Sequence, residues 1–163
     1  MHETSELLLC HLHGDLFELS VEMGFDSIKF IDAFMRSRCA ADLDMDFNRL
    51  HWMGERYLME ELIEELGDKL VPGEQYSKDA MFWIGYTYRY WHFLTGESSK
   101  EISKQASGDK MIRVYPAYHT FTNMDLAVEL LKEEAAERAA RKKRTDVIKG
   151  EFMADLIPAM RRR

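Results

Sequence analysis

The chain has 163 residues, of which 46% are hydrophobic and 31% are charged, and its formal net charge is −7. This length suits one domain of ordinary size with an appended segment, and the hydrophobic share can fill a core, which excludes a disordered chain. No apolar run reaches the roughly 18–20 residues that a membrane span needs. The acidic start and the two cysteines, Cys10 and Cys39, are typical neither of a secretory signal nor of a disulfide framework, so we expect a cytoplasmic protein.

Charge is distributed unevenly along the sequence. Residues 1–137 hold 13 Lys and Arg against 26 Asp and Glu, a net charge of −13. Residues 138–163 hold 9 against 3, a net charge of +6. An acidic surface repels nucleic acid and attracts basic partners, whereas a short basic segment does the opposite. We therefore predict an acidic, all-helical body over residues 1–131 and a basic helical arm over residues 132–163.

Apolar residues recur at helical spacing through most of the chain, and strand signals are nearly absent. In the first half, the pattern predicts a helix that ends at Gly24 and a second helix that Asp26 caps. A third helix is predicted over residues 47–66, with Trp52 facing inward. Its acidic run over residues 60–65 is interleaved with apolar residues, which predicts a solvated helix face.

The second half of the sequence predicts four further helices, over residues 78–94, 98–106 and 109–115 and from residue 122 onward. Ser77 caps the first of these, and Ser98 with Glu101 forms a capping box for the second. Pro116 is expected to end the third. The prediction is an all-α fold, a multi-helix globular bundle around a central aromatic helix with a C-terminal helical extension.

The helix over residues 78–94 is apolar on nearly every side, which is typical of a central helix packed all round. Its interior Gly85 is expected to permit close approach of another helix, with Gly54 as the counterpart. Arg89 interrupts the apolar pattern, and a buried guanidinium requires a carboxylate. The candidate carboxylates are Glu55, Glu60, Glu61 and Glu97. Binding of an anionic ligand or of a partner's carboxylate by Arg89 is the alternative.

His92 and Glu97 lie close to Arg89 in the sequence, and these three side chains are the candidates for a small-ligand site or an active site. Cys10 and His13 share one helical face, but the sequence lacks the further ligands that zinc requires. It also lacks a glycine-rich phosphate loop and a nucleophile elbow. We therefore predict no catalytic residue, no metal and no cofactor.

Residues 98–115 also fit a helix-turn-helix, which makes a DNA-binding regulator the alternative function. The buried positions of that motif hold Ile102, Ala106, Met111 and Tyr115. The cations available to phosphates are Lys100, Lys104, Lys110 and Arg113. DNA binding depends on neutralising phosphates, so the acidic body makes DNA the less favoured partner.

The sequence carries three distinctive blocks, residues 47–61, 84–102 and 115–120, and the middle block has the sequence IGYTYRYWHFLTGESSKEI. These blocks resemble an uncharacterised bacterial family that is encoded beside toxins similar to ADP-ribosyltransferases. The resemblance covers about half of the chain, from Asn48 to Leu130. It implies an antitoxin or another accessory factor of a toxin–antitoxin locus, and it supplies no catalytic residues.

We predict from these features a non-enzymatic protein-binding factor, an antitoxin that neutralises a partner toxin enzyme by direct binding. Toxins that bind NAD or RNA present basic clefts, to which an acidic body is complementary, and such complementarity favours fast association. No membrane partner is expected. The residues predicted to contact a partner or ligand are Arg89, His92, Glu97, Arg113, His119, Phe152 and Leu156.

The arm is predicted to project from the body. Leu126, Ala127, Leu130 and Leu131 are expected to anchor its start. Beyond Lys132 the first apolar residues are alanines, which are too small to hold a helix on a core. A second apolar patch follows over residues 147–160, with a bend expected at Gly150 and the helix end near Pro158. We expect the patch to contact a partner or a second copy of the protein, and folding back onto its own body is the alternative.

Overall fold

The computed structural model describes residues 4–161, apart from the side chain of residue 159. This range contains eight α-helices, two short 3-10 helices and no β-strand, which confirms the all-α prediction. The α-helices are α1 (Thr4–Glu22), α2 (Ser27–Met35), α3 (Arg38–Asp44), α4 (Glu55–Leu66), α5 (Lys78–Thr95), α6 (Ser99–Gln105), α7 (Gly108–Tyr118) and α8 (Met124–Arg161). The 3-10 helices are η1 (Arg49–Trp52) and η2 (Gly67–Lys69).

Three of the predicted helix caps are confirmed. The side chains of Asp26, Ser77 and Ser98 accept hydrogen bonds from backbone N–H groups three residues ahead, at 3.0, 3.1 and 3.2 Å. Each bond satisfies one of the donors that a helix N-terminus leaves unpaired. At the start of α8, the side chain of Asn123 supplies the cap by accepting a hydrogen bond from the Asp125 amide at 2.9 Å.

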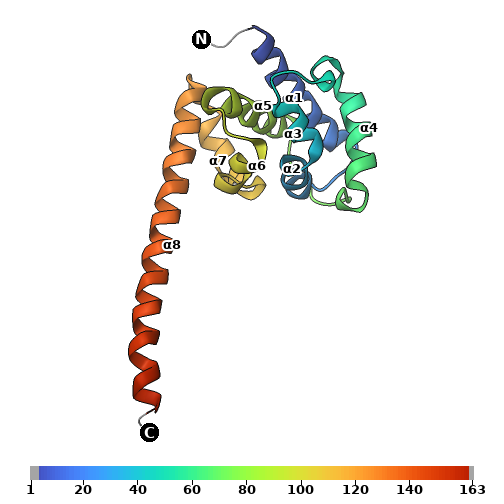
Figure 1. Cartoon of the computed structure of the whole chain (residues 1–163). Helices are drawn as coiled ribbons and strands as arrows, with labels where there is room; N and C mark the ends of the chain where they lie inside the picture. Colours follow the sequence, from blue (N-terminus) through green and yellow to red (C-terminus); the bar gives the residue numbers. More distant parts are fainter. Residues whose placement is uncertain (1–3, 162–163) are drawn as a thin grey trace.

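The centre of the body is the contact between α1 and α5, which lie side by side in Figure 1. A Cβ atom added to Gly85 of α5 would lie 2.6 Å from the carbonyl oxygen of His13 in α1. Gly85 therefore permits close helix approach as predicted, but the counterpart is α1. The predicted counterpart, Gly54, is the N-cap of α4, and a Cβ atom added there would meet no other atom within 4 Å.

Two predicted helices differ in the structure. The helix expected over residues 47–66 is divided into η1 and α4, and Trp52, expected to face inward, is 85% exposed. Pro116, expected to end a helix, lies inside α7. A proline removes one N–H donor from a helix, but the last turn persists because the amide of His119 still donates to the carbonyl of Tyr115 at 3.1 Å.

Helix α8 begins on the body and then leaves it (Figure 1). Ala127, Val128 and Leu131 are buried against the core, whereas Leu126, an expected anchor, is 43% exposed. From residue 136 onward every described side chain is exposed. The helix continues through Gly150, where we expected a bend, and through Pro158, where we expected its end. Within residues 4–161, none of the helices combines the length and apolar character that crossing a bilayer requires.

Candidate functional site

The strongest polar feature inside the body is an ion pair between α5 and α3. The Nη1 atom of Arg89 lies 2.7 Å from Oδ1 of Asp44, and the two side chains are 2% and 13% exposed. The predicted need for a carboxylate is met, but none of the four predicted glutamates supplies it. Asp44 was missed because it ends a seven-residue helix that the apolar pattern does not indicate.

Ser99, at the start of α6, completes the environment of this carboxylate. Its hydroxyl donates to Oδ1 of Asp44 at 2.7 Å, and its backbone amide donates to Oδ2 at 2.8 Å. The Nη2 atom of Arg89 donates to the same hydroxyl at 3.3 Å. The hydroxyl therefore lies between the guanidinium, from which it accepts, and the carboxylate, to which it donates.

His13 of α1 lies on the other side of the guanidinium. The Nε atom of Arg89 donates to Nδ1 of His13 at 3.3 Å, and arginine has no acceptor, so the histidine proton lies on Nε2. Burial, together with the charge of Arg89, lowers the pKa of His13 well below its ordinary value, which keeps the ring neutral. The buried Nε2 has no hydrogen-bond partner among the described residues.

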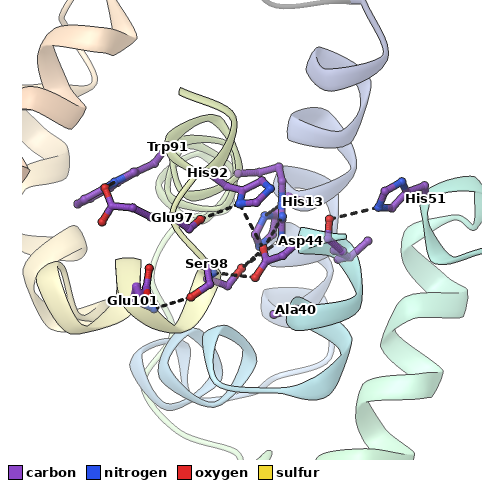
Figure 2. Close-up of polar contacts among 12 residues, drawn as sticks. His13, Ala40, Asp44, His51, Trp91, His92, Glu97, Ser98 and Glu101 are labelled. Carbon is purple, nitrogen blue, oxygen red and sulfur yellow. Dashed lines mark hydrogen bonds and ion pairs between the residues drawn. The ribbon is translucent and has the colours of Figure 1, made fainter. Parts of the chain in front are cut away.

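Figure 2 shows that His92 and Glu97 face two different sides of α5. The Nδ1 atom of His92 donates to the backbone carbonyl of Glu97 at 2.7 Å and lies 3.7 Å from Oδ1 of Asp44. The Glu97 carboxylate instead binds Trp91, Gln105 and Lys132. Although burial opposes it, these hydrogen bonds and the charge of Lys132 lower the pKa of Glu97.

The polar cluster therefore has a structural role. It links α1, α3, α5 and α6 through one buried guanidinium. Glu97 belongs to a separate set of contacts that attaches the base of α8 to the body, and Arg138 adds a bond to the carbonyl of Gln105 at 2.6 Å. The structure thus does not bring Arg89, His92 and Glu97 together around one pocket.

The other predicted site residues are dispersed. Arg113 is exposed on α7 and pairs with Asp109 at 2.9 Å. His119 caps α7, where its ring stacks on Tyr115 with 4.4 Å between centroids. Phe152 and Leu156 lie on the projecting part of α8 and are 63% and 37% exposed.

A groove between α3 and α4 is a surface that sequence analysis missed. It encloses about 300 Å³. Its charged lining residues are Asp42, Glu61, Glu64, Glu65, Arg38 and Arg49. Glu65 also accepts from the amides of Arg38 and Cys39 at 2.8 and 3.0 Å, which ties α4 to the start of α3. The acidic run over residues 60–65 is a solvated helix face, as predicted, and it also forms one wall of this groove.

The segment over residues 45–54, which we call the α3–α4 connection, continues from this groove. Arg49 and Leu50 of the connection line the groove directly. The connection exposes three large apolar side chains, Met45 at 52%, Phe47 at 92% and Trp52 at 85%. An apolar set of this kind beside charged residues is typical of a protein-contact surface.

A second groove of about 490 Å³ lies near α2 and η2, and Glu65 and Leu66 contribute to its wall.

Cys10 and Cys39 are free and buried, and burial raises the pKa of each thiol to about 12. In residues 4–161 no group of three His, Cys, Asp or Glu side chains is placed to hold a metal ion. Comparison with protein-family models, curated proteins and solved structures gave no match to this chain.

Proposed function

We propose that this chain is a non-enzymatic protein-binding factor, an antitoxin that neutralises a partner toxin enzyme by direct binding. The observation that carries the proposal is the exposed α3–α4 connection beside the acidic groove. Trp52 and Phe47 are almost fully solvated there, and aromatic anchors of this type dominate the free energy of protein association.

The charge of the body supports a basic partner. Residues 1–137 carry a net charge of −13, and four carboxylates against two arginines line the groove beside the connection. Opposite potentials accelerate encounter and suppress wrong partners. A toxin enzyme that binds an anionic substrate has a basic cleft, and covering that cleft with an acidic surface would block substrate entry.

The contacts within the buried polar cluster also support a binding function over a catalytic one. Arg89 is occupied by Asp44, Ser99 and His13, and these contacts hold four helices together. The resemblance of residues 47–61 to the toxin-associated family falls on the connection itself. The proposal therefore places the toxin contact at Phe47, Trp52 and the neighbouring acidic groove.

Co-expression with the product of the neighbouring gene tests this proposal. We expect that product to stop growth alone, and we expect this chain to restore growth and to co-purify with it. A Phe47→Ser/Trp52→Ser variant should lose both effects, whereas Leu8→Ser, which changes a 65% exposed leucine on α1, should keep them. A harmless neighbour, or restored growth with the double variant, would contradict the proposal.

A DNA-binding regulator is the alternative function, because α6 and α7 do form two helices joined by a short turn. Ile102, Ala106 and Met111 are fully buried in this hairpin, whereas Tyr115, also expected at a buried position, is only partly buried. Of its four candidate cations, however, Lys110 pairs with Glu134 and Arg113 pairs with Asp109. A salt-dependent shift of promoter DNA that Lys100→Ala/Lys104→Ala abolishes would favour this alternative.

A further inference from the structure

The distal part of α8 carries an uncovered apolar face. Its members recur at helical spacing and are between 37% and 64% exposed: Phe152, Met153, Leu156, Ile157 and Met160. Leu131, which is buried in the body, and Met160 are separated by about eight full helical turns. The distal face therefore points to the same side of α8 as the face that contacts the body.

The body of the same chain does not reach this face. Between Leu131 and the distal residues, a continuous helix spans roughly 30–45 Å at about 1.5 Å per residue. Figure 1 shows the distal half of α8 extending beyond the body. Covering the face by folding back would require breaking the helix, so any cover would come from another chain.

Charge decides which surface can provide that cover. Residues 138–163 carry a net charge of +6, so two arms that lie side by side repel each other. The body, residues 1–131, holds 12 Lys and Arg against 23 Asp and Glu, a net charge of −11, and attracts the arm. An arm that docks on the body of a second copy gains from both charge and apolar burial.

The body also exposes an apolar surface that fits the arm. Phe47 and Trp52 of the α3–α4 connection are 92% and 85% exposed. The charged lining of the adjoining groove is four carboxylates, Asp42, Glu61, Glu64 and Glu65, against two arginines, Arg38 and Arg49. This combination of aromatic and acidic side chains complements the arm, in which basic clusters over residues 141–144 and 161–163 flank the apolar patch. The patch itself holds Lys149, Glu151 and Asp155.

We propose that the arm of one copy docks on the α3–α4 connection and acidic groove of a second copy, and that two copies exchange their arms reciprocally. The shape of the chain permits this closure. In Figure 1, α4 and α8 lie at opposite sides of the body. A two-fold axis that lies below the body in this view can therefore relate two copies. It places α4 of each copy beside the arm of the other copy. The distal apolar face of each arm then points toward the body of the other copy.

This dimer rests on the same surface as the proposed toxin contact, because the arm and a basic toxin share the chemistry that the surface recognises. The arm would then cover the binding surface until a toxin displaces it. The self-association requires no toxin, so its failure is distinguishable from failure of the antitoxin proposal.

Sedimentation and light scattering on the full chain test the exchange. We expect a species of about twice the 19.2 kDa chain mass. Phe152→Asp/Leu156→Asp in the arm and Phe47→Ser/Trp52→Ser in the connection should each weaken association by at least about tenfold. All four side chains are exposed, so circular dichroism should show intact folding. Leu8→Ser is the control and should remain dimeric, and a monomeric native chain would overturn the proposal.

Mixing the two double variants separates arm exchange from other dimers. The connection variant retains an intact arm and the arm variant retains an intact connection, so the mixture should recover dimers through one good interface. If two arms instead paired directly with each other, the connection variant would remain dimeric and mixing would not restore dimers of the arm variant. Either result would overturn the proposal. Raising the salt concentration should weaken the exchanged dimer severalfold, because screening reduces arm–body attraction. A dimer that tightens with salt would equally overturn it.

Discussion

The buried polar cluster and the arm are opposite in how their side chains are satisfied. At the cluster, a guanidinium from α5 is enclosed by partners from α1, α3 and α6, and only His13 Nε2 among its described atoms stays unpaired. In the arm, apolar side chains lie in solvent with nothing over them. The comparison shows that the cluster is satisfied within one chain, whereas the arm leaves its apolar side chains uncovered.

The two regions also differ in what a substitution can reveal. In the cluster, removing one group leaves its buried partners without compensation, so the effect is on folding. In the arm, an exposed side chain contributes little to the stability of an isolated chain, so the effect is on association.

Asp44→Ala is expected to have the largest effect. It leaves the charge of Arg89 buried and unpaired, and the free energy of unfolding should fall by about 3–5 kcal/mol. Urea unfolding monitored by circular dichroism measures this loss. Asp46→Ala, which removes an exposed carboxylate two residues later, should change stability by less than about 0.5 kcal/mol.

A double variant tests whether the unpaired charge of Arg89 causes that loss. Arg89→Met combined with Asp44→Ala removes both charges, so the pair should be more stable than Asp44→Ala alone. A double variant that is less stable than the single one would show that the ion pair is not the source of the effect.

Two glycine substitutions should change stability in opposite directions. Gly85→Ala places a methyl group against the backbone of His13, and we expect a loss of about 1–3 kcal/mol. Gly150→Ala lies in the exposed part of α8 with open space around it, and higher helix propensity should add up to about 1 kcal/mol to the stability of that helix. Thermal unfolding of both variants, followed by helical ellipticity, shows whether each substitution raises or lowers the stability.

His13 predicts a pH dependence of smaller size. Its pKa is lowered in the folded state, so below its ordinary value of 6.5 the unfolded chain binds a proton that the folded chain does not. Below pH 6.5, protonation of His13 in the unfolded chain should therefore lower the free energy of unfolding by about 1.4 kcal/mol for each pH unit of acidification. His13→Gln should lack this contribution. If the free energy of unfolding falls equally steeply with pH in the native protein and in His13→Gln between pH 6.5 and 5.5, the assignment to His13 is contradicted.

Local features of the sequence predicted most of the fold. Asp26, Ser77 and Ser98 were recognised as caps because a cap depends on residues three positions apart. The close approach at Gly85 followed from a glycine in an otherwise apolar helix. These features need no knowledge of which helices are neighbours.

Features that depend on tertiary neighbours were not predicted. Asp44 meets Arg89 across 45 positions of sequence, and its short helix has no distinctive apolar pattern. Trp52 fits helical spacing with the residues of α4, but Gly54 interrupts the helix and leaves the indole in solvent. Glu97 was paired with Arg89 by proximity in sequence, whereas its carboxylate contacts α8.

Backbone hydrogen exchange across residues 147–160 tests directly whether a second chain covers the arm. A solvated helix of this length is marginal without packing, so its amides exchange rapidly unless they are covered. We predict protection at high protein concentration that disappears on dilution, while the amides of α5 remain protected at every concentration. Protection of residues 147–160 that does not change with protein concentration, or is absent throughout, would contradict coverage of the arm by a second copy.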